Sequence, residues 1–175
     1  YQGLSTIMLS LLVEKVSGLK FSDFVEQEIW QPAGAESDAT FINAAYGRSA
    51  VPLGFNSTLR DMARYGMLFV PSGRKGKTPV ISDEHLYAIQ KEGRPEILAA
   101  QETGCWFCDR NTDEKNILDG EPLHHVTYQW EFVMKDGDFW KAGFGGSGLY
   151  ISPDRDLVIA YFDCRNSDGK ENRLP

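Results

Sequence analysis

The first half of the sequence shows the three-to-four-residue spacing of apolar side chains that is typical of helices. A first helix is predicted over residues 4–16, and Gly18 is its natural end. Because apolar residues occur on more than one side of this helix, we expect it to be largely buried. A shorter amphipathic helix is predicted from Phe21 and should end before Pro32.

Two further helices are predicted, each with a residue that can cap its amino end. Asn56 or Ser57 can cap a helix that continues to about residue 70. Asp61 lies favourably in the first turn of that helix, and Asp61 and Arg64 are expected to be cap and surface-pair residues rather than catalysts. Ser82 can cap a last helix that continues to about residue 91.

The spacing changes to that of strands in the last third of the chain. Residues 126–134 and 149–151 have strand character, and the Asp-Gly pair in "MKDGDFW" predicts a hairpin turn. The near-continuous apolar run "DLVIAYF", from Asp156, is typical of a central strand. Residues 93–122 are polar and rich in turn formers, so we expect an irregular insertion there. With no repeat and no linker, the chain is predicted to be one α+β unit in which three antiparallel strands follow the helices.

Composition narrows the function classes. The chain has 175 residues, a formal net charge of −7 and a pI near 5.0, which disfavours binding to the phosphate backbone of nucleic acids. The longest apolar run, within residues 7–16, is far shorter than the roughly 20 residues of a membrane span. The three Cys residues give no complete disulfide framework, so a periplasmic or secreted location and a cytoplasmic one both stay open. No cofactor is indicated.

Four segments, in order, carry motifs of a known family. The first is Tyr1 with "LLVEKVSG", which resembles the motif Y-x-N/S followed by a helix ending E-[KR]-[VA]-[TS]-G. The other three are "FSDFVEQEIWQPAGAESDATF", "GFNSTLRDMARYGMLFVPSG" and "GFGGSGLYISPDRDLVIAYF". Together they cover most of the chain except residues 93–122, and they resemble segments of the serine beta-lactamase, penicillin-binding-protein and esterase family with class C architecture.

The resemblance implies that this chain is the C-terminal portion of one serine beta-lactamase-like domain. The implied fold is an antiparallel sheet flanked by helices, with a helical region. In that family a Ser nucleophile and a Lys, spaced S-x-x-K, lie upstream of the Tyr. The reaction proceeds through an acyl-enzyme formed on the Ser. The implied substrates are small esters, amides or beta-lactams, and the missing upstream segment of the same protein is an implied partner. This chain alone should be inactive.

The pattern S-x-x-K also occurs three times inside the chain, at Ser17, Ser72 and Ser167. Each occurrence contains a Gly between Ser and Lys and lies where a helix stops or a loop is predicted. So short a pattern arises readily by chance. We therefore expect none of the three to be the nucleophile.

Tyr1 corresponds by resemblance to the family's general-base Tyr; otherwise it is a terminal aromatic that packs on the sheet. Gly3 stands where the family usually has Asn or Ser and is placed in the substrate-binding set. Glycine offers no side-chain hydrogen bond there, so the contact that orients substrate or Lys must come from elsewhere or be absent.

The glycine-rich stretch of residues 143–147 should border the active site, where many relatives carry K-T-G or H-x-G. Gly145 and Gly146 are expected to present backbone N–H groups to the oxyanion, with substrate contacts from Gly143, Phe144 and Ser147. Lys141, the nearest candidate for the cation that would bind a substrate carboxylate, lies two positions early. This favours esters or amides without an obligatory carboxylate. The alternative is a hairpin that merely packs well.

Aromatic residues could line an acyl pocket. Trp106 and Phe107, in the irregular insertion, are expected at the pocket rim. Tyr128 and Trp130 are two residues apart and are better explained as core residues on one face of a strand, and Trp140 is a further candidate.

Two alternatives to a hydrolase remain open. Cys105 and Cys108, with His124 and His125 further on, could form a zinc site, a redox-active dithiol or a structural disulfide, although adjacent His residues bind one ion awkwardly. Otherwise the two Cys residues are free or incidental thiols. Cys164 is expected to be a small core residue. Gly3 and the missing cation favour the other alternative, a noncatalytic relative that keeps the fold for binding.

Overall fold

A computed structural model describes residues 3–43, 47–76, 78–96, 123–143 and 146–162. Within them, a helical region of α1 (Gly3–Ser17), α2 (Phe21–Val25) and the π-helical turn η1 (Glu26–Trp30) is followed by the short strands β1 (Thr40–Phe41) and β2 (Phe55–Asn56). The helices α3 (Leu59–Met67), α4 (Pro71–Arg74) and α5 (Asp83–Lys91) come next. The last strands are β3 (Leu123–Thr127), β4 (Trp130–Met134), β5 (Phe139–Ala142), β6 (Gly148–Ser152) and β7 (Leu157–Tyr161).

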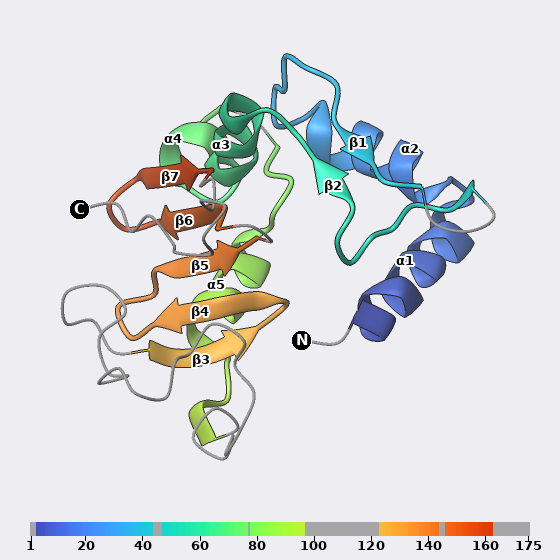
Figure 1. Ribbon diagram of the computed structural model, residues 1–175. Helices are drawn as coiled ribbons and strands as arrows, with labels where there is room; N and C mark the ends of the chain where they lie inside the picture. Colours follow the sequence, from blue (N-terminus) through green and yellow to red (C-terminus); the bar gives the residue numbers. More distant parts are fainter. Residues whose placement is uncertain (1–2, 44–46, 77, 97–122, 144–145, 163–175) are drawn as a thin grey trace, which may run out of the picture.

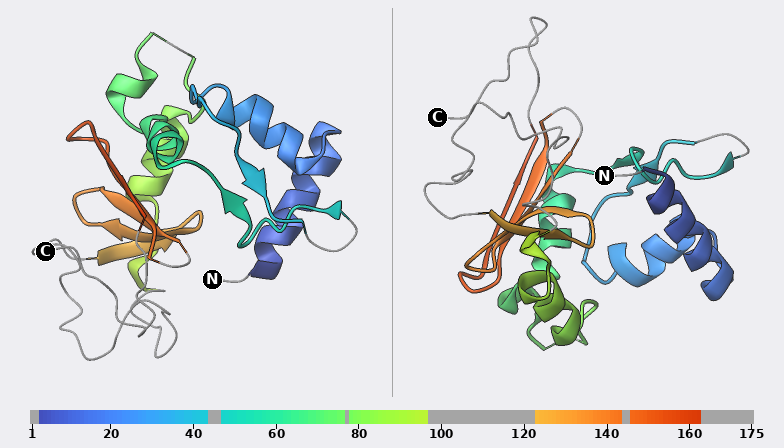
Figure 2. Two further views of the ribbon diagram at one scale, coloured as in Figure 1. Left: turned by 45° about the horizontal axis from the view of Figure 1, so that its top comes forward. Right: turned by 90° about the horizontal axis from the view of Figure 1, so that it is seen from below.

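The last five strands form one antiparallel sheet in the order β3-β4-β5-β6-β7, with α3 and α5 against one of its faces (Figure 1). The helical region with β1 and β2 lies to one side of that helix layer (Figure 2). The fold is therefore α+β, as the sequence predicts, and has more strands than expected.

The hydrophobic core lies between the sheet and the helices α3 and α5. Phe69, just after α3, sets its ring edge-on against Trp130 at 5.3 Å and Phe139 at 5.6 Å between ring centroids. The buried residues of this core are Leu68, Phe69, Val70, Ile89, Trp130, Val133, Phe139, Leu149 and Ile151. They come from both layers, so burial of their side chains holds the helices on the sheet.

Residues 126–134, predicted as one strand, are a hairpin. Tyr128 and Gln129 form the turn between β3 and β4, with φ of 44° and 66°. Because neither is Gly or Asn, the sequence carries no signal for this left-handed turn. The turn also corrects the prediction for Tyr128, whose side chain is 65% exposed, whereas Trp130 is a core residue as expected.

The Asp-Gly hairpin of "MKDGDFW" is confirmed. Gly137 has φ of 102°, which glycine adopts at little cost, and the Met134 N–H donates to the Asp138 carbonyl at 2.8 Å.

Strand β7, predicted to be central, is an edge strand among the described residues. Val158 and Ala160 pack against the core, while Leu157 and Ile159, on the alternate positions, stay half-exposed. The apolar run is continuous although the core takes only alternate residues.

The first helix is well formed but is not buried, contrary to the prediction. Leu4, Met8 and Val16 are 68%, 60% and 79% exposed. Among the described residues, α1 packs mainly on α2, so only one side of the helix is covered. Apolar periodicity locates the helix but does not say which elements cover its other sides. Among the described residues, no helix combines the length and the apolar character that crossing a membrane requires.

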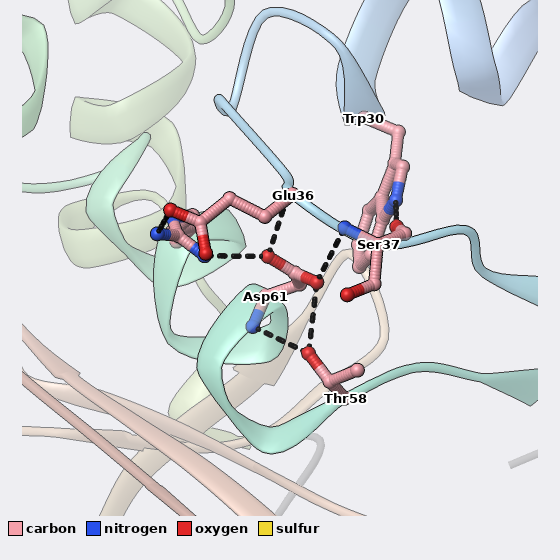
Figure 3. A network of polar contacts seen from close by, with 6 residues as sticks. Trp30, Glu36, Ser37, Thr58 and Asp61 are labelled. Carbon is pink, nitrogen blue, oxygen red and sulfur yellow. Dashed lines mark hydrogen bonds and ion pairs between the residues drawn. The ribbon is translucent and has the colours of Figure 1, made fainter.

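A buried carboxylate joins α3 to the loop after η1 (Figure 3). Asp61, which is 1% exposed, accepts the backbone N–H of Glu36 at 2.9 Å and that of Ser37 at 3.1 Å. The Arg64 guanidinium donates to the same carboxylate at 2.7 Å. Thr58, rather than Asn56 or Ser57, is the N-cap of α3. Asp61 is thus a buried residue whose hydrogen bonds connect α3 to the loop after η1, and it is not a surface residue.

These hydrogen bonds change the acidity of the carboxyl group. The Glu36 N–H, followed by the Thr58 hydroxyl, Arg64 and the Ser37 N–H, holds the pKa of Asp61 well below its usual range, against the opposing effect of burial. Hence Asp61 is ionised throughout the neutral range and is unsuited to proton transfer there.

Candidate active site

The glycine-rich segment joins β5 to β6. The Gly143 N–H donates to the Ser147 carbonyl at 2.7 Å, which closes the connection, and Gly146 has φ of 90°. A Cβ on Gly143 would lie 2.2 Å from the Ser147 Oγ, so a larger residue here would require the Ser147 side chain to move. Gly143 and Ser147 are therefore side by side, while Phe144 and Gly145 lie outside the described residues.

The strand before this segment carries the nearest cation, Lys141. Its ammonium lies 2.6 Å from the Glu131 carboxylate and donates to the Ala142 carbonyl at 3.1 Å. The Lys141 side chain is thus held on β4 and β5. A lysine bound in this way is poorly placed to bind the carboxylate of a substrate.

The first turn of α1 is joined to the same sheet. The Thr6 hydroxyl donates to the Gln129 side-chain oxygen at 3.3 Å, at the turn between β3 and β4. Gly3 begins α1, and a Cβ there would lie 3.3 Å from the Pro52 Cβ, which leaves little room for a larger side chain. Tyr1 lies outside the described residues, and its role stays a prediction.

The two S-x-x-K serines within the described residues, Ser17 and Ser72, each make hydrogen bonds within the fold. The Ser17 hydroxyl donates to the Val13 carbonyl at 2.7 Å and accepts the Leu19 N–H at 3.2 Å, so it closes the end of α1. Ser72 lies in the four-residue α4 rather than in a loop, and its N–H donates to Asp156 at 2.9 Å. Ser167 lies outside the described residues.

The predicted pocket aromatics are not brought together by the described structure. Trp106 and Phe107 lie outside the described residues. The Trp140 ring stacks on Phe132 with centroids 4.8 Å apart, and Trp130 belongs to the core.

The two histidines considered for a metal are bonded to protein groups. His125, fully buried on β3, has its Nε2 2.9 Å from the Ile89 carbonyl, so Nε2 carries the proton and donates. Its Nδ1 lies 2.8 Å from the Nδ1 of His124, and burial lowers the pKa of His125. Within the described ranges no cluster of three or more His, Cys, Asp or Glu could hold a metal ion. Cys105, Cys108 and Cys164 lie outside them.

Glu131 is a residue near the site that the sequence analysis did not single out. Its Oε2 accepts the Ala142 N–H at 2.9 Å, next to the glycine segment. A signal was available, because pairing outward from the Asp-Gly turn places Glu131 opposite Lys141. Opposite charges at paired positions are a recognisable feature of neighbouring strands.

Comparison with known proteins shows the family to which the chain belongs. The Beta-lactamase family model matches residues 1–173, so the chain belongs to the Beta-lactamase family. The family resemblance predicted from the four sequence segments is thereby confirmed.

Two relatives have hydrolase names. A curated "6-aminohexanoate-dimer hydrolase" of Paenarthrobacter ureafaciens is 26% identical over 160 residues, which are 91% of this chain and 37% of the relative. A solved Bacillus anthracis structure that carries the same hydrolase designation in its name is 24% identical, with a TM-score of 0.67 over 98% of this chain and 39% of that one. The chain thus spans less than two fifths of either relative, and the structural likeness shows the fold.

Proposed function

We propose that this chain is part of a serine hydrolase that acts by acyl-enzyme formation on a small ester, amide or beta-lactam. The observation that carries the proposal is the connection between β5 and β6, which by resemblance corresponds to the segment that borders the family's active site. There Gly143 and Ser147 are held by a 2.7 Å hydrogen bond, and the Ser147 Oγ lies where a Cβ on Gly143 would be. Backbone N–H groups of Gly145 and Gly146 would stabilise the oxyanion.

The nucleophile in this proposal is a Ser of an S-x-x-K element upstream of Tyr1. Its Oγ attacks the carbonyl carbon, and its proton passes through Lys and Tyr1 to the leaving amine or alcohol as the carbonyl bond to that group breaks. Water then cleaves the acyl-enzyme, which returns the Ser hydroxyl and releases the acid. The Ser17 hydroxyl, which closes the end of α1 with two hydrogen bonds, supports an upstream nucleophile.

An amide is the favoured substrate class. Lys141 is bound to Glu131 and to the Ala142 carbonyl, so this cation is not directed at a substrate carboxylate. The curated relative named above is a hydrolase of a dimer of an amino acid, which is joined through an amide. The relative's name favours an amide, and the setting of Lys141 favours a substrate that needs no carboxylate at this position.

The test is to treat the complete gene product with a fluorophosphonate, and separately with a penicillin, and to map any adduct by peptide mass spectrometry. We expect an adduct on an upstream Ser of an S-x-x-K element, and its loss in the Tyr1→Phe variant. An adduct on Ser17, Ser72 or Ser167 would refute the assignment of the nucleophile. A folded protein with no adduct would favour a noncatalytic binding protein.

A further inference from the structure

The end of β5 is held on its β4 side by two side chains. Strands β4 and β5 pair Phe132 with Trp140 and Val133 with Phe139, and one further step places Glu131 opposite Lys141. Ala142 lies beyond this pairing. Its N–H donates to the Glu131 Oε2 at 2.9 Å, and its carbonyl accepts from the Lys141 Nζ at 3.1 Å.

These contacts form a closed ring. The Glu131 Oε1 and the Lys141 Nζ are 2.6 Å apart, so each side chain binds both the other side chain and the Ala142 backbone. The Glu131 side chain is 18% exposed and the Lys141 side chain 34% exposed. Exposed ion pairs contribute little to stability, but this half-buried pair also satisfies two backbone groups that lie beyond the β4 pairing.

The other side of the same residue faces β6. Ala142 pairs there with Gly148, and the next residue, Gly143, donates its N–H to Ser147. A Cβ on Gly148 would lie 2.4 Å from the Tyr161 hydroxyl and 2.7 Å from the Trp140 Nε1. Gly143, at the start of the glycine segment, and Gly148, just after its end, are therefore tightly packed. Glu131 and Lys141 hold Ala142, the residue before Gly143, from the β4 side.

We propose that Glu131 and Lys141 are positioning residues that fix the Ala142 peptide and, through the hydrogen bond between Gly143 and Ser147, thereby aim the N–H of the neighbouring Gly146 at the reacting carbonyl. This inference rests on the proposed function, since it assigns the pair a part in acyl transfer. Glu131 has the larger part, because its carboxylate binds both the Ala142 N–H and Lys141. Neither side chain touches the substrate. A misaligned oxyanion donor slows the chemical step more than it weakens binding.

The experiment uses the complete gene product and the variants Glu131→Ala, Glu131→Gln and Lys141→Met. Lys135→Met, an exposed lysine just after β4, is the matched control. The first measurement is hydrogen exchange at the Ala142 amide, resolved by fragmentation mass spectrometry. The second is the concentration dependence of acylation by a fluorophosphonate, which separates the maximal rate from the half-saturating concentration.

We expect Glu131→Ala to accelerate exchange at Ala142 by about tenfold or more, because a charge-assisted hydrogen bond is lost. Its maximal acylation rate should fall by about tenfold, with the half-saturating concentration nearly unchanged. Glu131→Gln should exchange more slowly at Ala142 and be acylated faster than Glu131→Ala, since its amide oxygen can still accept the Ala142 N–H. Lys135→Met should change neither.

Unchanged exchange at Ala142 in Glu131→Ala would overturn the proposed restraint. Faster exchange with an unchanged acylation rate would overturn the positioning role, and so would a Glu131→Gln variant as slow as Glu131→Ala. If the wild-type protein is never acylated, the proposed function fails and the positioning role fails with it. The exchange measurement then still decides whether the pair holds the strand, so the two failures are distinguishable.

Discussion

Thr58 and Asp61 bind each other across the first turn of α3. The Thr58 hydroxyl accepts the Asp61 N–H at 3.1 Å and donates to the Asp61 Oδ2 at 2.8 Å. The same carboxylate takes two N–H groups from the loop after η1 (Figure 3). One helical turn thus fixes both its own start and the position of a segment more than twenty residues earlier.

Removal of the Thr58 hydroxyl should weaken this turn. We expect Thr58→Ala to lower the free energy of unfolding by about 1 kcal/mol, the usual effect of losing an N-cap. Thr58→Ser retains the hydroxyl and should stay close to wild type. Urea unfolding of the complete protein measures both, and equal stability of Thr58→Ala and wild type would contradict the capping role.

Asp61 should make stability depend on acid. Its pKa in the folded state lies below the unfolded value of about 3.9, so the unfolded state binds more protons as the pH falls. The stabilisation is therefore present above about pH 4 to 5 and is lost as the pH falls toward the folded-state pKa. Urea midpoints between about pH 3 and pH 6 should fall with acid in the wild type and fall less in Asp61→Asn. Parallel curves for the two proteins would refute this.

Gly66 marks the closest approach of α3 to the sheet. A Cβ at this position would lie 2.5 Å from the Val158 Cγ1 on β7. We expect Gly66→Ala to destabilise the protein by about 1–3 kcal/mol despite the better helix propensity of alanine. Val158→Ala should relieve the clash, so the double variant should be more stable than the sum of the single changes predicts. Additive effects in thermal unfolding would show that the clash is not the cause.

His125 should produce a second pH dependence, near neutrality. Burial, more than the nearby His124 and Lys91, lowers its pKa below the unfolded value of about 6.5, against the opposing hydrogen bond to Ile89. Protons then bind the unfolded state more readily, so stability is full above about pH 6.5 and declines as the pH falls through the folded-state pKa. His125→Gln should flatten the slope of unfolding free energy with pH in this range. An unchanged slope would rule out His125 as its source.

The space beside Gly143 should matter for acylation. A Cβ there would lie 2.2 Å from the Ser147 Oγ, so Gly143→Ala should push the Ser147 side chain aside, disturb the segment and slow acylation by a fluorophosphonate by up to about tenfold. Ser147→Gly removes the clashing atom and should restore much of the rate when combined with Gly143→Ala. Wild-type acylation by Gly143→Ala would show that this contact does not constrain the segment.

Much of the fold could be read from the sequence because its signals are local. The Asp-Gly turn and the Ser82 cap depend on a few neighbouring residues, and both were predicted correctly. The turn at Tyr128 and Gln129 could not be predicted, since both residues adopt positive φ although neither is one of the usual turn formers. The role of Asp61 depends on backbone groups from a distant loop, which no local pattern reveals.

The candidate site was predictable only in part, for a similar reason. The family resemblance marked the glycine segment before its conformation was known. Predicting the restraint by Glu131 requires the register between β4 and β5. That register follows from the hairpin turn only when the strand pairing is continued from the turn as far as Glu131 and Lys141. Predicting the exposure of α1 requires knowing which other elements cover the helix, and the spacing of its apolar residues does not contain that information.

The order of strands in the sheet has a consequence for how the chain folds. Each of β3 to β7 pairs with the strand next to it in the sequence (Figure 1). Each pairing therefore closes a short loop, which carries a small entropic cost and is rapid. The contacts of α3 with β6 and β7 join segments far apart in the sequence and close a much longer loop. During synthesis, α3 leaves the ribosome well before β7. The apolar face of α3 therefore stays uncovered until β6 and β7 have been made, and it is the surface that a chaperone would shield.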